Sequence, residues 1–154
     1  MKELKIVDPS IIEDIVCEDV KLSEFEYMKE LGEQLIEICI ENGGVGLSAP
    51  QVGIFKKMFI WMNGNDTYQI VINPKYYYAD KKTSNLVEGC LSYPDRNFFT
   101  TRYKYINASY DVLVNGEIKR IYRKLSGEKA FIFQHETDHT CGQTIKMIGQ
   151  ELFT

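Results

Sequence analysis

Gln134-His135-Glu136-Thr137-Asp138-His139 is the segment on which our prediction of the fold depends, because it contains the pattern H-E-x-x-H. On an α-helix, residues four apart differ by only about 40° around the axis, so His135 and His139 project from one face. Their ring nitrogens can therefore bind one metal ion. Glu136 lies about 100° around the helix from His135, which suits a base beside the ion better than a third ligand. The bare pattern also occurs in surface salt bridges, so a metal site needs further support.

Two features of the sequence support a metal site on this helix. His135 and His139 are the only histidines in the chain, and the preceding Phe131-Ile132-Phe133 is too apolar for a fully solvated face. A buried pair of unpaired imidazoles would be costly, whereas a metal ion satisfies both. The two histidines are thus predicted to be metal ligands.

A catalytic metal ion usually takes three protein ligands and leaves one position for water. The tail after His139 contains no histidine and a single acidic residue, Glu151, so we expect the third ligand upstream. Cys90 is the best candidate, because Gly89 lets the backbone approach closely and Glu88 can hold a neighbouring ligand in place. A buried core cysteine is the alternative interpretation of Cys90.

The other three cysteines are predicted to be structural. Cys39 falls on the apolar stripe of a predicted helix, and Cys17 lies in an acidic loop. Cys141 would point about 200° away from His139, which excludes it as a ligand from the same helix and favours a small buried residue near the helix end. The chain has no C-x-x-C pair and no recognisable secretion signal, so reduced thiols are expected.

Two helices are predicted, one before and one after a run of strands. Ser23 and Glu26 form a capping box for the first helix, whose apolar residues recur at helical spacing up to a stop at 42–44. The second helix carries the H-E-x-x-H pattern. It should span about 126–141, with Gly142 at its end.

The sequence between the helices alternates and is rich in β-branched and aromatic residues. This predicts strands over 57–62, 68–72, 76–78 and 85–87, a long strand over 102–114 and a return strand over 118–122. A polar turn is expected over 63–66, and Asn115-Gly116 predicts a type I′ turn before the return strand. Strands grouped between helices favour an α+β fold. We therefore expect one domain over residues 1–154, with antiparallel or mixed β-sheets around a central metal-binding helix and an N-terminal helix.

The composition is that of an ordinary globular domain. Hydrophobic residues make up 44% and charged residues 26% of the chain, and the formal net charge is −4. This balance of charges gives no reason to expect that the protein binds nucleic acid directly or binds to an anionic membrane surface. No stretch approaches the roughly 18 apolar residues of a membrane span. A cytoplasmic protein without a membrane segment is the expectation.

Three segments, in this order, are similar to the signature motifs of the peptide deformylases. They are Gly44-Val45-Gly46-Leu47-Ser48-Ala49-Pro50-Gln51, Glu88-Gly89-Cys90-Leu91-Ser92 and Gln134-His135-Glu136-Thr137-Asp138-His139. The opening Leu4-Lys5-Ile6-Val7-Asp8-Pro9 also resembles the start of that family. One motif would be weak, but the ordered set is specific, and the resemblance covers nearly the whole chain.

The resemblance implies a hydrolase that removes the N-formyl group from formyl-methionine at the start of nascent polypeptides and releases formate. A metal-bound water would be the nucleophile, and Glu136 would act as general base and then as general acid. The side chain of Gln51 and the backbone N–H of Leu91 would hold the developing oxyanion. The implied metal ligands are Cys90, His135 and His139.

The formylated peptide is expected to pair like an added strand with the backbone beside the site. The implied substrate-binding residues are Gly44, Val45, Gly46, Gly89, Phe131 and Ile132, the last two lining the methionine pocket. One divalent ion is implied, with Fe²⁺ as the physiological metal; zinc, nickel and cobalt suit the same donors.

The sequence departs from the family at two places. Ser48 stands where the family usually has alanine, a change that we expect to leave the chemistry untouched. Thr144-Ile145-Lys146-Met147 replaces a Leu-Phe-like continuation, and the chain ends at Thr154 without the further C-terminal helix of many members. Ribosome contacts attributed to that helix in bacterial members therefore cannot be carried over to this chain, which leaves proximity to the ribosome an open question. The short end is similar to that of some viral and other compact members, and the expected location would be the host cytoplasm if the protein is encoded by a virus. A monomer is expected.

Two alternatives remain from the residues alone. An endopeptidase is suggested by H-E-x-x-H, although the missing downstream ligand argues against it. A non-catalytic structural metal domain would need a fourth protein ligand that closes the site.

Overall fold

The computed structural model of the chain describes residues 3–64 and 66–153. Residue 65 of the predicted turn, and residues 1, 2 and 154 of the predicted domain, lie outside the described residues. The helical elements are η1 (Pro9–Ile11), η2 (Leu22–Glu24), α1 (Phe25–Glu41), η3 (Ala49–Val52), α2 (Gly127–Thr140) and α3 (Ile145–Ile148). The strands are β1 (Gly46–Ser48), β2 (Met58–Met62), β3 (Tyr68–Tyr78), β4 (Thr83–Cys90), β5 (Tyr93–Tyr103), β6 (Tyr105–Val114), β7 (Glu117–Ser126) and β8 (Gln150–Leu152).

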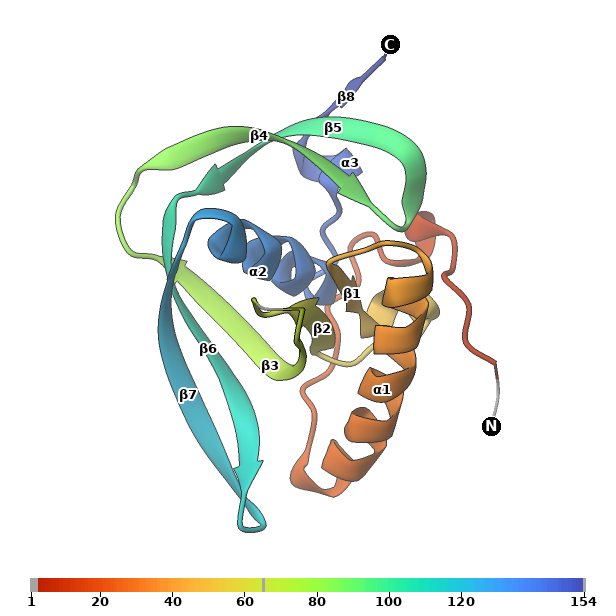
Figure 1. Cartoon of the computed structure of the whole chain (residues 1–154), viewed down its shortest axis with the longest axis vertical. Helices are drawn as coiled ribbons and strands as arrows, with labels where there is room; N and C mark the ends of the chain where they lie inside the picture. Colours follow the sequence, from red (N-terminus) through yellow and green to blue (C-terminus); the bar gives the residue numbers. More distant parts are fainter. Residues whose placement is uncertain (1–2, 65, 154) are drawn as a thin grey trace.

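The strands form two antiparallel sheets on either side of α2. A five-stranded sheet has the order β1-β2-β3-β6-β7, and a three-stranded sheet has the order β4-β5-β8. In Figure 1, β4 and β5 pass over one side of α2, while β3, β6 and β7 curve around the other. The predicted α+β class, with antiparallel sheets around a central helix and a helix near the N-terminus, is confirmed.

The single long strand predicted over 102–114 is wrong. The strand is interrupted at Lys104: β5 of the small sheet ends just before this residue, and β6 of the large sheet begins just after it. The Lys104 N–H donates to the Lys82 carbonyl at 3.0 Å, outside either ladder. Alternation cannot reveal this crossing, because Arg102 and Ile106 are both buried at even-numbered positions, so the pattern continues in phase through the break.

The strands predicted separately over 68–72 and 76–78 are one strand, β3. Its pairing with β6 shifts register between Ile72 and Lys75, and Asn73 there has a φ of 53°. The side chain of Asn73 accepts from Val20 N at 2.8 Å and donates to Val20 O at 3.0 Å, which fixes this bulge against the chain before α1.

The predicted hairpin between β6 and β7 is confirmed. Asn115 and Gly116 have φ values of 51° and 78°, the positive values that both central residues of a type I′ turn require.

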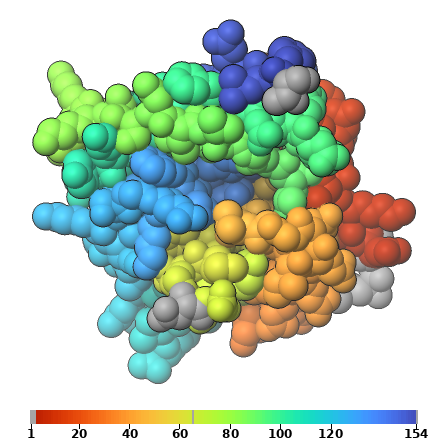
Figure 2. Space-filling model, turned by 45° about the horizontal axis from the view of Figure 1, so that its top comes forward, coloured from red at the N-terminus to blue at the C-terminus, as the bar shows by residue number. Residues whose placement is uncertain are grey.

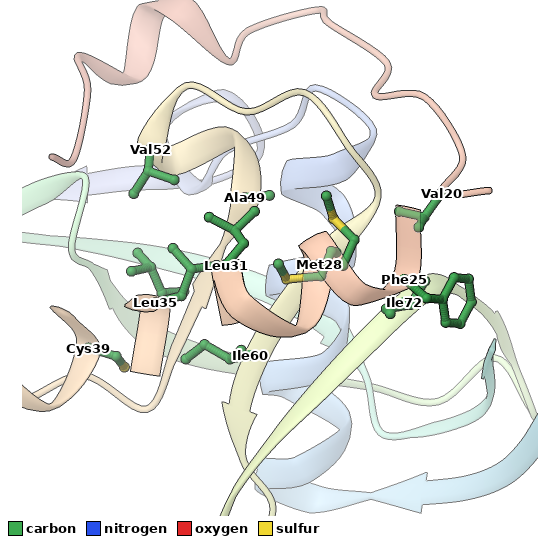
Figure 3. Packing of buried hydrophobic residues seen from close by; sticks show 12 residues of the cluster. Val20, Phe25, Met28, Leu31, Leu35, Cys39, Ala49, Val52, Ile60 and Ile72 are labelled. Carbon is green, nitrogen blue, oxygen red and sulfur yellow. The ribbon is translucent and has the colours of Figure 1, made fainter. Parts of the chain in front are cut away.

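Helix α1 begins differently from the prediction. The Glu24 carboxylate accepts from the Lys21 backbone N–H at 3.0 Å, so the first turn starts at Leu22 as a 3₁₀ turn. Ser23 lies inside that turn and does not cap the helix, and the predicted Ser23–Glu26 box is wrong. The apolar face is as expected: Leu31 and Leu35 are buried beside Ile60 (Figure 3). Each such leucine contributes about 1.5–3 kcal/mol through burial.

Helix α2 spans Gly127–Thr140, within a residue or two of its predicted limits, and Gly142 follows with a φ of 80°. Phe133 on this helix packs edge-on against Phe59 and Trp61 of β2, with ring centroids 5.3 and 5.5 Å apart. This contact fixes the helix against the large sheet. None of the helices in the described part of the chain is long and apolar enough to cross a membrane.

Candidate metal centre

The three predicted donors lie together. Cys90 is the last residue of β4, and His135 and His139 are on α2; their possible ligand atoms all lie within 4.8 Å of one another. The Cys90 sulfur is 3.8 Å from His139 Nε2, and the two imidazole rings have centroids 4.7 Å apart. Both histidines are buried. The small sheet thus supplies the sulfur and the helix supplies both nitrogens.

Both imidazoles are held through Nδ1. His135 Nδ1 lies 2.7 Å from Glu88 Oε1. His139 Nδ1 lies 3.0 Å from the Ser48 hydroxyl and 3.2 Å from Glu136 Oε1. A histidine that binds a metal through Nε2 donates its Nδ1–H to such an oxygen, which orients the ring. The surroundings of both rings fit metal ligation.

The electrostatics also fit a cation among these three side chains. Burial alone would raise the pKa of the Cys90 thiol, but His139 and His135 outweigh it and bring the pKa to about 6. Burial lowers the pKa of His139, but the Cys90 thiolate and Glu136 outweigh it and raise that pKa to about 9. A metal ion would replace the protons that balance the thiolate. One sulfur and two nitrogens suit zinc, iron(II), nickel or cobalt.

A buried arginine ties the two sides of the centre together. Arg102 on β5 donates to Glu88 through Nε at 2.8 Å and Nη2 at 3.1 Å, and to Asp138 on α2 through Nη1 at 2.8 Å. All three side chains are buried or nearly so. Burial raises the pKa of Glu88, but His135 and Arg102 outweigh it and lower the pKa to about 2. Glu88 is therefore a carboxylate that can hold the His135 ring.

Two further hydroxyls complete this network. Tyr76 donates to Asp138 Oδ1 at 2.6 Å, and Thr100 donates to Glu88. Glu88 is predicted from the sequence as the partner of a ligand, whereas Arg102, Asp138 and Tyr76 are not. A signal was present: Thr100 and Arg102 occupy inward positions of an alternating strand, where polar residues need a reason.

The side chain of Gln51 contacts that of Cys90. It belongs to η3 and is buried; its Oε1 accepts from the Ser48 N–H at 2.9 Å and from the Ser48 hydroxyl at 3.0 Å. Its Nε2 donates to Ser92 Oγ at 2.9 Å and points to Cys90 Sγ at 3.4 Å. The amide N–H₂ group therefore faces the donor cluster.

A cleft of about 560 Å³ opens beside the cluster. In Figure 2 the surface is hollowed between the green atoms of β4 and β5, the blue atoms of α2 and the orange atoms at the end of α1. Gln51 and His139 are not among the residues that line this cleft. The lining does include the other predicted site residues: Gly44, Val45, Gly46, Gly89, Cys90, Leu91, Phe131, Ile132, His135 and Glu136.

Gly46 and Gly89, two of the predicted site residues, are glycines for different structural reasons. A Cβ on Gly46 would lie 2.6 Å from Glu136 Oε2, so no larger residue fits without moving the carboxylate. A Cβ on Gly89 would meet Asn97 Oδ1 at 3.6 Å, an ordinary contact. Gly89 instead coincides with a register shift between β4 and β5.

The other cysteines match the predictions in part. Cys39 is fully buried on the apolar face of α1, as expected. Cys17 lies in a loop, as expected, but is buried. Cys141 is exposed, so its prediction as a buried residue is wrong, because α2 ends at Thr140 and the chain turns there.

Comparison with known proteins gives a consistent result. The family model described as polypeptide deformylase matches residues 4–149, which include all three motif segments. Peptide deformylase from Thermotoga maritima is 38% identical over 120 residues, covering 78% of this chain and 71% of that protein.

Solved structures agree with the sequence matches. The crystal structure of peptide deformylase from Thermotoga maritima aligns with a TM-score of 0.82 at 32% identity, covering 96% of this chain and 97% of that one. A probable peptide deformylase from Synechococcus phage S-SSM7 also gives a TM-score of 0.82 at 32% identity, covering 94% of this chain and 98% of that one. The similarity therefore extends over the whole fold.

Proposed function

Since this chain belongs to the peptide deformylase family of hydrolases, we propose that it removes the formyl group from the N-terminal formyl-methionine of nascent polypeptides and releases formate. The observation that carries the proposal is the Cys90-His135-His139 cluster, of which Cys90 and His135 line a cleft that Glu136 also lines. Residues 1–154 act in this proposal as one catalytic domain.

The three clustered side chains hold one divalent ion in this proposal. When bound, the ion supplies a Lewis acid for the formyl carbonyl and makes a water molecule more acidic. The donors suit zinc, nickel or cobalt as well as iron(II), and iron(II) is the physiological ion that family resemblance favours. Glu88 and Arg102 keep the His135 ring in place, whichever metal is bound.

Glu136 moves the proton. Its carboxylate lines the cleft next to Gly46, where a peptide can approach, and it lies on the helix turn between the two histidines. It takes a proton from the attacking water and then gives one to the leaving amine, so that the amide C–N bond breaks and formate leaves.

Gln51 and Leu91 stabilise the negative charge that develops on the formyl oxygen. The Gln51 amide N–H₂ faces the cluster at Cys90, and Leu91 follows Cys90 in the chain and lines the cleft. Fixed donors at this point lower the barrier because the charge is larger in the transition state than in the substrate.

The substrate binds along the same cleft. Its backbone pairs beside Val45, in the loop after α1, and Gly89, near the end of β4, both of which line the cleft. The methionine side chain contacts Phe131 and Ile132, which lie half-buried on the helix wall. Gly44, in the loop after α1, and Gly46, the first residue of β1, also line the cleft and have no side chain that could obstruct the peptide.

Formate release from formyl-methionyl-alanyl-serine is the decisive assay, with Glu136→Ala as the inactive control. Turnover that the substitution removes, while the metal stays bound, supports the proposal. No turnover by the metal-loaded protein contradicts it. Cleavage of internal bonds in unformylated peptides would instead indicate an endopeptidase.

X-ray absorption at the metal edge tests the ligand set. One sulfur, two nitrogens and an exchangeable oxygen are expected. A fourth protein ligand would indicate a closed structural site. The measurement should be made under anaerobic conditions, so that iron(II) is retained.

The proposal also includes the setting of the enzyme. It acts as a monomer in the cytoplasm, where its substrate, the formylated nascent chain, is made, and it has no direct contact with nucleic acid. Sedimentation of the metal-loaded protein tests the monomer, and a dimer would contradict it.

A further inference from the structure

Ser48 stands where the family usually has alanine, and its hydroxyl makes hydrogen bonds that an alanine could not make. It is the last residue of β1, its side chain is fully buried, and its hydroxyl is 3.0 Å from both His139 Nδ1 and Gln51 Oε1. From the sequence alone, serine at this position is expected to leave the chemistry untouched. The hydroxyl instead lies between a metal-ligand candidate and the side chain proposed to hold the oxyanion.

The direction of each hydrogen bond follows from the atoms present. His139 Nε2 faces the Cys90 sulfur at 3.8 Å. A nitrogen that binds a metal offers its lone pair, so the ring proton resides on Nδ1 and Nδ1–H is a donor. Gln51 Oε1 can only accept. Ser48 has one O–H, which therefore donates to Gln51, while the Ser48 oxygen accepts from His139.

This arrangement fixes the orientation of the Gln51 amide. Its oxygen is held by two donors of Ser48, the hydroxyl at 3.0 Å and the backbone N–H at 2.9 Å. A flipped amide would place its N–H₂ group against that backbone N–H, donor against donor. The N–H₂ group consequently stays on the side of Cys90 and Ser92.

Ser48 also affects Glu136. His139 Nδ1 lies 3.2 Å from Glu136 Oε1 and 3.0 Å from the Ser48 hydroxyl. With the hydroxyl as a second and nearer acceptor, the Nδ1–H does not depend on the carboxylate. Glu136 then retains its oxygen atoms for the proton that it moves.

We propose that Ser48 is a positioning residue whose hydroxyl couples His139 to Gln51, fixing the imidazole tautomer and the amide orientation together. The inference rests on the proposed function, because it takes His139 and Gln51 as parts of the site. Its effect on the reaction passes through these two side chains, since Ser48 is buried behind them and does not line the cleft.

The test compares Ser48→Ala with Ser109→Ala in the zinc-loaded protein. Ser109 is a buried serine on β6 that accepts from Arg120 at 2.9 Å, away from the centre, and so controls for the loss of any buried hydroxyl. The first readout is the ¹⁵N and ¹H NMR signal of the His139 Nδ1–H. It should shift in Ser48→Ala alone, while the His135 signal, whose Nδ1 faces Glu88, stays constant.

The second readout is the kinetics of formate release. Ser48→Ala should lower kcat about tenfold, the low end of what loss of a partner of a metal ligand costs, with KM and zinc content unchanged. In a Gln51→Ala background the same substitution should lower kcat much less, because the residue through which it acts is absent.

The possible outcomes are distinct. An unchanged His139 signal in Ser48→Ala, or an equal loss of kcat in the wild-type and Gln51→Ala backgrounds, overturns the inference. If the wild-type protein releases no formate, the proposed function fails, and the NMR comparison alone then decides whether Ser48 holds the His139 tautomer.

Discussion

Two arginines on β5 make nearly the same contact in different surroundings, and removing each should have very different consequences. Arg102 donates to Glu88 at 2.8 and 3.1 Å and is buried. Arg96 donates to Glu151 at 2.8 and 2.6 Å, and its side chain is 38% exposed. We predict that Arg102→Met strongly destabilises the fold, whereas Arg96→Met has a much smaller effect.

The magnitude for Arg102 follows from what it would leave behind. Breaking a buried ion pair by removing one partner costs about 3–5 kcal/mol, because the remaining charge is buried and uncompensated. Glu88 would keep His135 and Thr100, and Asp138 would keep Tyr76, as hydrogen-bond partners. The low end, about 3 kcal/mol, is therefore expected, or a shift of roughly a hundredfold in the folding equilibrium.

Urea unfolding at a fixed zinc concentration measures this difference. With a slope of about 1–3 kcal/mol per molar urea, Arg102→Met should lower the midpoint by about 1–3 M. Arg96→Met is the matched control, since an exposed pair is screened by water. Equal midpoints for the two variants would refute the argument that burial, and not geometry, makes the Arg102 contact important.

Three further outcomes are expected. Gly46→Ala should lower kcat for formate release about a hundredfold with the metal retained. The alanine Cβ would lie 2.6 Å from Glu136 Oε2 and so displace the base, and an unchanged kcat would contradict this. Thiol labelling of the native protein, followed by mass spectrometry, should modify exposed Cys141 long before Cys17 and Cys39, whose burial raises each pKa to about 11; equal rates would argue against the packing described. Removing the metal with a chelator should lower the melting temperature and zinc should restore it, since a ligand that binds only the folded state stabilises it; an unchanged melting temperature would speak against the metal centre.

Much of the fold could be predicted because local patterns determine it. Helix α2 and the Asn115-Gly116 turn depend on residues adjacent in sequence, and both are confirmed. The break at Lys104 could not be predicted, since it depends on which sheet each half of the strand joins. The start of α1 was missed because both Ser23 and Glu24 offer capping oxygens, and only the structure shows that Glu24 reaches the chain.

The residues of the candidate site, like the elements of the fold, could be predicted only in part. The donors Cys90, His135 and His139 could be predicted because ligand chemistry restricts them to few residue types, and the structure places them together. Among the side chains that hold them, Glu88 could be predicted, whereas Arg102 and Ser48 were missed. Arg102 lies on a strand that alternation describes only as inward or outward, and the role of Ser48 depends on a ring nitrogen distant in sequence.

The crossing at Lys104 has a consequence for the order of folding. Cys90 and His139 are 49 residues apart, and the crossing lies between them. The β4–β5 and β6–β7 hairpins can each form from neighbouring residues. The donors, however, meet only after the small sheet, which carries Cys90, docks on α2, and this requires closing a long loop first. We therefore expect the centre to assemble after the transition state for folding. A metal ion that binds there would slow unfolding and leave the folding rate nearly unchanged.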